Sequence, residues 1–255
     1  MAFPDTFVRD FRARKPLYGP FVRMAGHITT EILSGVGFDC VCVDMEHSPL
    51  SRMDVDGLIS GFHARNTPVI VRPRTASHEH ILAALDADAA AVMAPHINTG
   101  EQAEALANAA TYFRGRGYAG ATRAALYGAR SMGDTIARAN AQAIVIAQVE
   151  HIDAVANIDV IVGVEGLDCI FIGRSDLTVS TGGTDTNAPE VVEAVDLVTR
   201  KAVEAGKVVG TFTGNLDELP NLQDQGISFF LLGSDYGMLR AGASAFKAKV
   251  DAKLN

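Results

Sequence analysis

Two acidic residues in this chain of 255 residues each follow a short apolar run. Glu150 follows the run 143–149, and Asp176 follows the run 167–172 after a Gly-Arg-Ser turn. Both runs are continuously apolar and rich in β-branched residues, which is typical of parallel strands covered on both faces. Acidic side chains at the carboxyl ends of such strands lie where α/β folds place their chemistry. Because two neighbouring carboxylates repel each other, the pair predicts a site for a hard divalent cation and therefore an enzyme.

A second group of polar residues follows another apolar run. Asp44, Glu46 and His47 lie together in the turn after it. A histidine there is well placed as a general base, because its pKa lies near neutrality, and a nearby carboxylate would fix its tautomer. The alternative is a helix-capping cluster at Ser48 and Ser51, with the acids near a helix N-terminus. The sequence leaves both interpretations open for His47.

Two arginines end the apolar run that begins at Pro68. A guanidinium offers two parallel donors, which match the two oxygens of a carboxylate substrate. Arg72 comes directly off the run, whereas Pro73 interrupts the strand before Arg74. We therefore favour Arg72 as the substrate ligand, with a structural salt bridge as the alternative.

Three further residues and one segment remain open. Asp86 or Asp88 could orient a catalytic group, although a solvated turn is the simpler explanation. His96 closes the fourth apolar run at the same predicted face and is a weaker candidate. The segment 114–133 is rich in Gly, Arg and Ala and shows no clear strand, so it is either an active-site loop or a surface excursion used in assembly.

Strand-like runs alternate with helical patterns along the whole chain, and this alternation predicts the fold. Eight strand–helix pairs in a chain of this size predict a (β/α)8 barrel, with a doubly wound open sheet as the alternative. Since no composition break or low-complexity linker occurs, we predict a single domain over 1–255. The predicted strands lie near 18–22, 39–45, 68–73, 90–95, 143–149, 168–172, 208–212 and 229–233. Predicted helices include 101–112, 189–205, 216–225 and a closing amphipathic helix over 236–253 that could pack on its own barrel or on a neighbouring subunit.

Composition narrows the class of protein. With 48% hydrophobic residues the chain can bury a large core, and no apolar run approaches the roughly 20 residues needed to cross a bilayer. The N-terminus is mixed in charge, so we do not expect a signal peptide. Cys40, Cys42 and Cys169 fall in apolar runs and predict buried thiols in a reducing, cytoplasmic environment. A net charge of −8 disfavours nucleic acid and anionic membranes as partners.

Taken together, these residues resemble the HpcH/HpaI family of class II, metal-dependent pyruvate aldolases. The resemblance rests on the segments 38–47, 71–73, 85–86, 147–150 and 171–177, which occur in the family's order. It extends from about residue 17 to the C-terminus. It implies a (β/α)8 TIM barrel of the phosphoenolpyruvate/pyruvate-binding type, whose last helix is exchanged between subunits of a homo-oligomer, a trimer or a hexamer.

The resemblance also implies the metal and the acid/base group. A divalent cation (Mg²⁺, Mn²⁺ or Co²⁺) would be held by the positions matching Glu150 and Asp176. His47 would be the acid/base group, supported by acids matching Asp44 and Asp86.

Further positions match the family's substrate site. Arg72 would contact the keto acid and steady the charge on its oxygen, and Gln148 would line the pyruvate site. Backbone N–H groups around Ser175 and Asp176 would receive the carboxylate. Arg174 stands where the family usually has proline, and we hypothesise that it affects the preferred aldehyde or keto acid.

The implied activity is that of an aldehyde-lyase. It would reversibly add pyruvate, or a related 2-keto acid such as hydroxypyruvate, to an aldehyde and give a 4-hydroxy-2-keto acid. No lysine lies at a predicted strand end, so no Schiff base is expected. The alternatives are an oxaloacetate decarboxylase or a malyl/citramalyl thioester lyase on the same barrel, and a non-catalytic binding barrel. A thioester lyase should show a site for a nucleotide-bearing tail, and none is readable.

Overall fold

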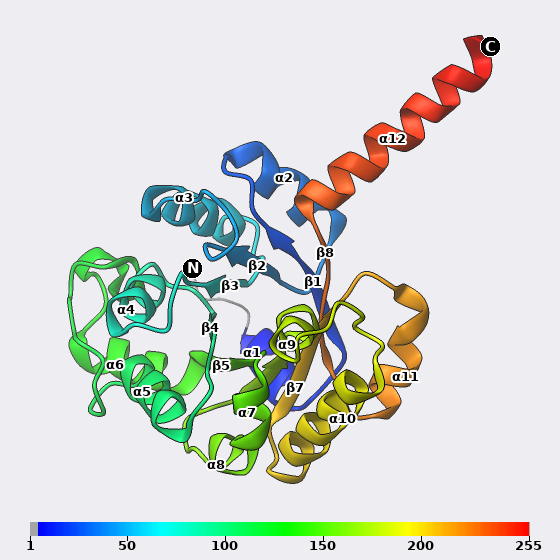
Figure 1. Cartoon of the computed structure of the whole chain (residues 1–255). Helices are drawn as coiled ribbons and strands as arrows, with labels where there is room; N and C mark the ends of the chain where they lie inside the picture. The colour runs from blue at the N-terminus through cyan, green and yellow to red at the C-terminus, as the bar shows by residue number, and fades with distance from the viewer. Residues whose placement is uncertain (1–4, 255) are drawn as a thin grey trace.

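The computed structural model describes residues 5–254, and within them eight parallel strands close into a barrel (Figure 1). Each strand pairs with the next along the chain, and β8 pairs with β1, with Leu17 opposite Phe229. The predicted (β/α)8 barrel is therefore confirmed, and each predicted strand is present with its ends displaced by at most one or two residues. The strands are β1 (Leu17–Val22), β2 (Val41–Asp44), β3 (Val69–Arg72), β4 (Ala91–Ala94), β5 (Ile144–Val149), β6 (Cys169–Ile172), β7 (Val208–Thr213) and β8 (Phe229–Ser234).

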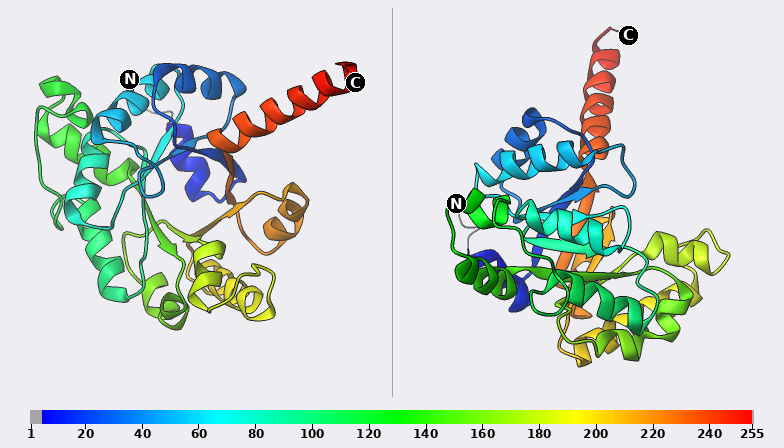
Figure 2. Two further views of the ribbon diagram at one scale, coloured as in Figure 1. Left: turned by 45° about the horizontal axis from the view of Figure 1, so that its top comes forward. Right: turned by 90° about the vertical axis from the view of Figure 1, so that its left-hand side faces the viewer.

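Helices surround the barrel as an outer layer (Figure 2). Local signals set their ends: Ser51 and Thr99 form capping boxes at the starts of two of them, and Gly37 ends another in the left-handed conformation. The helices are α1 (Asp5–Arg12), α2 (His27–Val36), α3 (Arg52–His63), α4 (His78–Asp86), α5 (Gly100–Ala110), η1 (Arg123–Gly128), α6 (Met132–Gln142), α7 (Ile152–Ala156), α8 (Ile158–Val162), α9 (Arg174–Ser180), α10 (Pro189–Glu204), η2 (Leu216–Glu218), α11 (Leu219–Asp224) and α12 (Asp235–Leu254).

Alternation along the strands decides which side chains face the barrel interior. Cys42, Ile70 and Ile146 belong to the interior core, while Val43 and Val71 beside them pack under the helices. Because side chains alternate in direction along a strand, the residue two positions further on faces the interior again, now at the carboxyl end. The residues placed there by this rule are Asp44, Arg72 and Gln148.

Helix α1 closes the opposite, amino end of the barrel. Its Phe11 is buried, and the Phe11 ring lies 5.3 Å from the ring of Phe229 at the start of β8. Arg12 bonds the side chain of Asp168 just before β6. The three cysteines are buried with free thiols, as predicted. Across residues 5–254, no helix combines the length and apolarity that a membrane crossing requires.

The segment 114–133 lies against the outer helices α3 and α4. It contains η1, and its Arg116 and Arg123 pair with Asp86 on α4 and Asp56 on α3, at 3.3 and 2.8 Å. Of the two predicted possibilities, these contacts favour the surface excursion.

Helix α12 extends away from the barrel into solvent (Figures 1 and 2). The buried carboxylate of Asp235 anchors its base, because it accepts the backbone N–H groups of Arg23 and Met24, both at 2.8 Å. Beyond that anchor its apolar side chains are exposed: Leu239 at 62% and Phe246 at 71%. The predicted closing helix is present, and it does not pack on its own barrel.

Candidate active site

A cavity of about 330 Å³ opens at the carboxyl end of the barrel. It combines cations, an imidazole, an amide and a carboxylate with aromatic walls, which is the usual make-up of a small-molecule site. Its lining residues include Phe21, Arg23, His47, Arg72, Gln148 and Asp176. A larger cavity of about 640 Å³ lies outside the barrel, against α3, α4 and η1.

Arg72 is the buried cation of this cavity. Its guanidinium donates two parallel hydrogen bonds to Asp44, from Nε to Oδ1 at 2.9 Å and from Nη2 to Oδ2 at 2.8 Å. Nη1 lies 3.1 Å from Glu46 Oε2 and 3.4 Å from Gln148 Oε1, and the group stacks 4.6 Å from the centre of the Phe21 ring. Such bidentate pairing fixes the orientation of the guanidinium before any substrate arrives.

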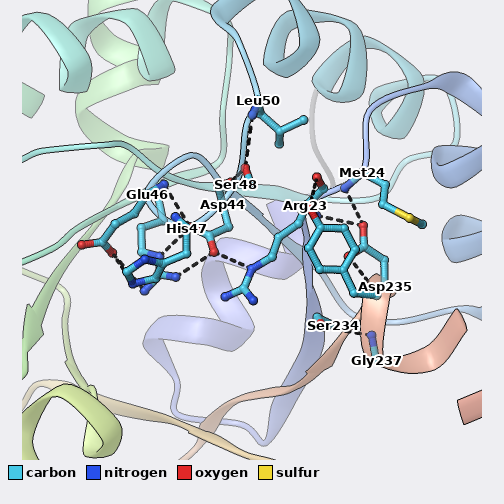
Figure 3. A network of polar contacts seen from close by, with 12 residues as sticks. Arg23, Met24, Asp44, Glu46, His47, Ser48, Leu50, Ser234, Asp235 and Gly237 are labelled. Atoms are coloured by element: carbon cyan, nitrogen blue, oxygen red, sulfur yellow. Dashed lines mark hydrogen bonds and ion pairs between the residues drawn. The ribbon is translucent and has the colours of Figure 1, made fainter. Parts of the chain in front are cut away.

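Asp44 holds this network together from the end of β2 (Figure 3). Besides Arg72, it accepts hydrogen bonds from Arg23 Nε at 2.7 Å and from the backbone N–H groups of Glu46 and His47. Burial would raise the pKa of Asp44, but the hydrogen bonds and charges of the two arginines outweigh it and lower that pKa. Asp44 is therefore an anion that positions Arg72.

His47 lines the cavity from the turn after β2, with its side chain half exposed. Its Nε2 lies 3.7 Å from Glu46 Oε2, too far for a hydrogen bond. Helix α3 is capped by Ser51 with Asp54, while the Ser48 hydroxyl bonds the carbonyl of Asp44. Of the predicted capping cluster, Ser51 caps α3 and Ser48 instead stabilises the turn after β2. His47 takes no part in the cap and lines the cavity.

A cluster of two carboxylates and an imidazole lies beside Arg72. His96 Nε2 is 2.9 Å from Glu46 Oε1, and His96 Nδ1 is 3.1 Å from Glu150 Oε1. The candidate ligand atoms of all three residues lie within 4.8 Å of one another. Glu150 also accepts the His96 backbone N–H at 2.9 Å and the Gln148 amide. Burial raises the pKa of Glu150 to about 7, with the charges of Glu46 and Asp176 adding to that rise.

The donor set of this cluster fits a divalent cation. Carboxylate oxygens and imidazole nitrogens are both common metal ligands in proteins. Gly173 leaves room for the cluster, because a Cβ at that position would lie 2.8 Å from Glu150 Oε2. The sequence prediction paired Glu150 with Asp176. The cluster contains Glu150 and adds Glu46 and His96, which the prediction did not include, and Asp176 is not one of its members.

Residues 174–176 form the first turn of α9 and contribute one wall of the cavity. Asp176 is exposed there, near enough to affect the pKa of Glu150. In the first turn of a helix, N–H groups lack intrahelical acceptors, so those of Ser175 and Asp176 suit an anion. Arg174 is held by Glu218 at 2.8 Å and Asn187 at 3.2 Å, so its charge is compensated. The effect of Arg174 on the preferred aldehyde or keto acid stays a prediction.

Two predicted residues lie away from the barrel cavity. Arg74 is exposed and donates to the carbonyl of Leu50 at 3.1 Å. Asp86 lines the outer cavity, where Arg116 is 3.3 Å from its carboxylate and burial raises its pKa. Among the described residues Asp86 contacts Arg116 and not His47, so its support of His47 stays a prediction.

Arg23 is a site residue that the sequence interpretation missed. It bonds Asp44 and lines the cavity. The signal was present: Arg23 directly follows β1 and alternates with Phe21, as Arg72 alternates with Ile70. His96 was undervalued because its backbone has φ of 57°, a left-handed conformation that turns the side chain and that strand periodicity does not predict.

Comparisons with known proteins agree with this geometry. Residues 17–241 match the family model described as HpcH/HpaI aldolase/citrate lyase. The chain is 32% identical to the hydroxypyruvate/pyruvate aldolase of Rhizorhabdus wittichii, covering 90% of this chain and 92% of that protein. It is 29% identical to the 4-hydroxy-2-oxo-heptane-1,7-dioate aldolase of Klebsiella pneumoniae, with 96% and 93% covered.

A solved structure agrees as well. The crystal structure of an HpcH/HpaI aldolase/citrate lyase family protein from Burkholderia cenocepacia superimposes with a TM-score of 0.89 at 31% identity, covering 96% of this chain and 98% of that one. This chain belongs to the HpcH/HpaI aldolase/citrate lyase family.

Proposed function

We propose that this protein is a class II aldolase that reversibly adds pyruvate or hydroxypyruvate to an aldehyde and gives a 4-hydroxy-2-keto acid. The observation that carries the proposal is the meeting of a buried, pre-oriented Arg72 and the Glu46–His96–Glu150 cluster at one mouth of the barrel. The names of the relatives support aldol chemistry over decarboxylation or thioester cleavage.

The cation is the cofactor that the proposal requires. Glu150 and Asp176, at the ends of β5 and β6, would hold Mg²⁺, Mn²⁺ or Co²⁺. When bound, the cation acts as a Lewis acid for the negative charge that develops on the keto oxygen of the substrate.

The residues of this chain would bind the substrate and transfer the proton. Arg72 donates hydrogen bonds toward the oxygen that gains charge, and its pairing with Asp44 means that little reorganisation is needed. Gln148 lines the keto-acid site, and N–H groups at Ser175 and Asp176 receive the carboxylate. The imidazole of His47 takes a proton from the carbon next to the keto group and returns one to the aldehyde oxygen.

A panel of aldehydes with each keto acid tests the function directly. We expect cation-dependent formation of 4-hydroxy-2-keto acids, detected by mass spectrometry, from at least one pairing of pyruvate or hydroxypyruvate with glycolaldehyde, glyceraldehyde or succinic semialdehyde. In the reverse direction a chelator should stop release of the keto acid. Cleavage of malyl thioesters, with no aldol product from any pairing, would reject the proposal.

We also propose that α12 packs on a neighbouring subunit of a trimer or hexamer. Isolated helices are marginally stable in water, and α12 leaves Leu239, Phe246 and Val250 exposed. Light scattering should give a mass that is a multiple of three chains. The double variant Phe246→Glu/Val250→Glu should shift to smaller species, whereas Val160→Glu, at an exposed position on α8, should not. A monomeric wild type at micromolar concentration would contradict this.

Two further assignments belong to the same proposal. The three free, buried thiols support a cytoplasmic location, where thiols stay reduced. The barrel is proposed to act as one domain on small-molecule substrates.

A further inference from the structure

His96 is held over the mouth of the barrel by an unusual backbone conformation. Its φ of 57° lies in the left-handed region, which costs a non-glycine residue about 1–3 kcal/mol when the surroundings impose it. The conformation directs the backbone N–H onto Glu150 Oε1 at 2.9 Å and brings Nδ1 to 3.1 Å from the same oxygen. Strain at a polar position beside a candidate metal site indicates a role for the side chain.

The charges around His96 call for a cation. The side chains of Glu46 and Glu150 are 9% and 1% exposed, so both carboxylates lie largely out of water. Arg72 is shared between Glu46 and Asp44, and Arg23 also pairs with Asp44. Two arginines therefore face the three carboxylates of Asp44, Glu46 and Glu150, and a cation beside His96 would compensate the remaining charge.

We propose that His96 is itself a ligand of the divalent cation, so that the cluster of Glu46, His96 and Glu150 adds an imidazole nitrogen to the two carboxylates, Glu150 and Asp176, that the proposed function assigns. The proposal rests on the proposed function, because it concerns the same cation, and it adds the metal preference. The two ring nitrogens now face the two carboxylates; on cation binding one nitrogen turns to the metal. The three residues come from the ends of β2, β4 and β5.

A nitrogen ligand has a definite chemical consequence. Mg²⁺ prefers oxygen ligands, whereas imidazole suits later first-row metals and affinity rises from Mn²⁺ to Co²⁺ at a given site. The site should therefore prefer Co²⁺ over Mg²⁺ more strongly than a site of carboxylates alone would.

Calorimetric titration of the full-length protein with Co²⁺ and with Mg²⁺ measures this preference without turnover. His96→Asn removes the imidazole, and asparagine tolerates the left-handed conformation. Loss of a residue that hydrogen-bonds a metal ligand typically lowers metal affinity by about 10–100-fold. Loss of a ligand itself should therefore lower the affinity for Co²⁺ by at least about tenfold. Mg²⁺ binding should change far less. The matched control is His151→Asn. His151 follows Glu150 in the sequence, caps α7 and lies outside the cluster.

Pulsed electron paramagnetic resonance of the Mn²⁺-loaded protein gives a second readout that does not depend on affinity. Hyperfine coupling to a directly bound nitrogen, lost in His96→Asn and kept in His151→Asn, is the expected result. Bound Mn²⁺ without nitrogen coupling, or an equal loss of Co²⁺ and Mg²⁺ affinity in His96→Asn, would overturn the inference. Aldol activity with an oxygen-only metal shell would leave the proposed function standing, whereas absence of both cation binding and aldol product would remove both.

Discussion

Replacing Arg72 with alanine is expected to lower kcat/KM for aldol cleavage by about 10²- to 10³-fold. Removing one pre-oriented donor to a developing oxyanion costs about that factor in other enzymes. Arg72 is 4% exposed and is pre-oriented by two bonds to Asp44, so water cannot easily replace it. Steady-state assay of keto-acid release checks the value.

Arg72→Ala should also lower the free energy of unfolding. Without Arg72, the fully buried Asp44 keeps Arg23 but loses its bidentate partner, and breaking a buried pair costs about 3–5 kcal/mol. Arg72→Lys separates the two effects, because it keeps the charge but not the parallel donors. Compared with Arg72→Ala, the Arg72→Lys variant should have a melting temperature much closer to that of wild type but little more activity.

Arg74→Ala is the matched control on the same turn. Arg74 is exposed and contacts the carbonyl of Leu50, so activity and melting temperature should stay close to wild type. If Arg74→Ala lost activity and Arg72→Ala did not, the choice between the two arginines would be wrong. If Arg72→Ala lost stability alone, the salt-bridge alternative for Arg72 would hold.

The barrel itself was predictable because its signals are local. Continuous β-branched runs, such as 143–149 and 168–172, indicate strands covered on both faces, and helical patterns between them indicate parallel crossovers. The ends of the strands were less certain. The second strand was predicted over 39–45, but β2 spans Val41–Asp44, because its hydrogen-bonded pairing with β3 begins and ends at those residues.

The site was predictable where a residue ends a strand. Asp44 and Arg72 were predicted from their places at strand ends and Gln148 from the family resemblance, and the structure has all three at the mouth of the barrel. The sequence does not give the pairings between them, because these depend on barrel closure. Arg23 reaches Asp44 across the β1–β2 pair.

Other parts of the site depend on features with no periodic signal. His96 bridges Glu46 and Glu150 through a left-handed residue. Asp86 was expected near His47 from the family pattern, yet it ends α4 and faces Arg116 in the outer layer.

Glu150→Gln is expected to abolish cation-dependent turnover, with a loss of at least about 10³-fold. Lewis-acid stabilisation is worth several kcal/mol, and each 1.36 kcal/mol is a factor of ten in rate. The fold should persist, because burial already opposes ionisation of Glu150 and raises its pKa to about 7. Circular dichroism should therefore match that of wild type, while calorimetry shows weakened Mn²⁺ binding.

The chelated wild type should behave like this variant, with one difference that decides the interpretation. Added Mn²⁺ should restore the chelated wild type and fail to restore Glu150→Gln, since only the variant lacks the carboxylate ligand. Glu165→Gln makes the same chemical change at a side chain that is 89% exposed, and it should bind Mn²⁺ and turn over normally. Near-normal turnover of Glu150→Gln would show that the buried carboxylate of β5 does not hold the cation. The charge on the keto oxygen would then be stabilised by Arg72, or by a cation that other residues hold.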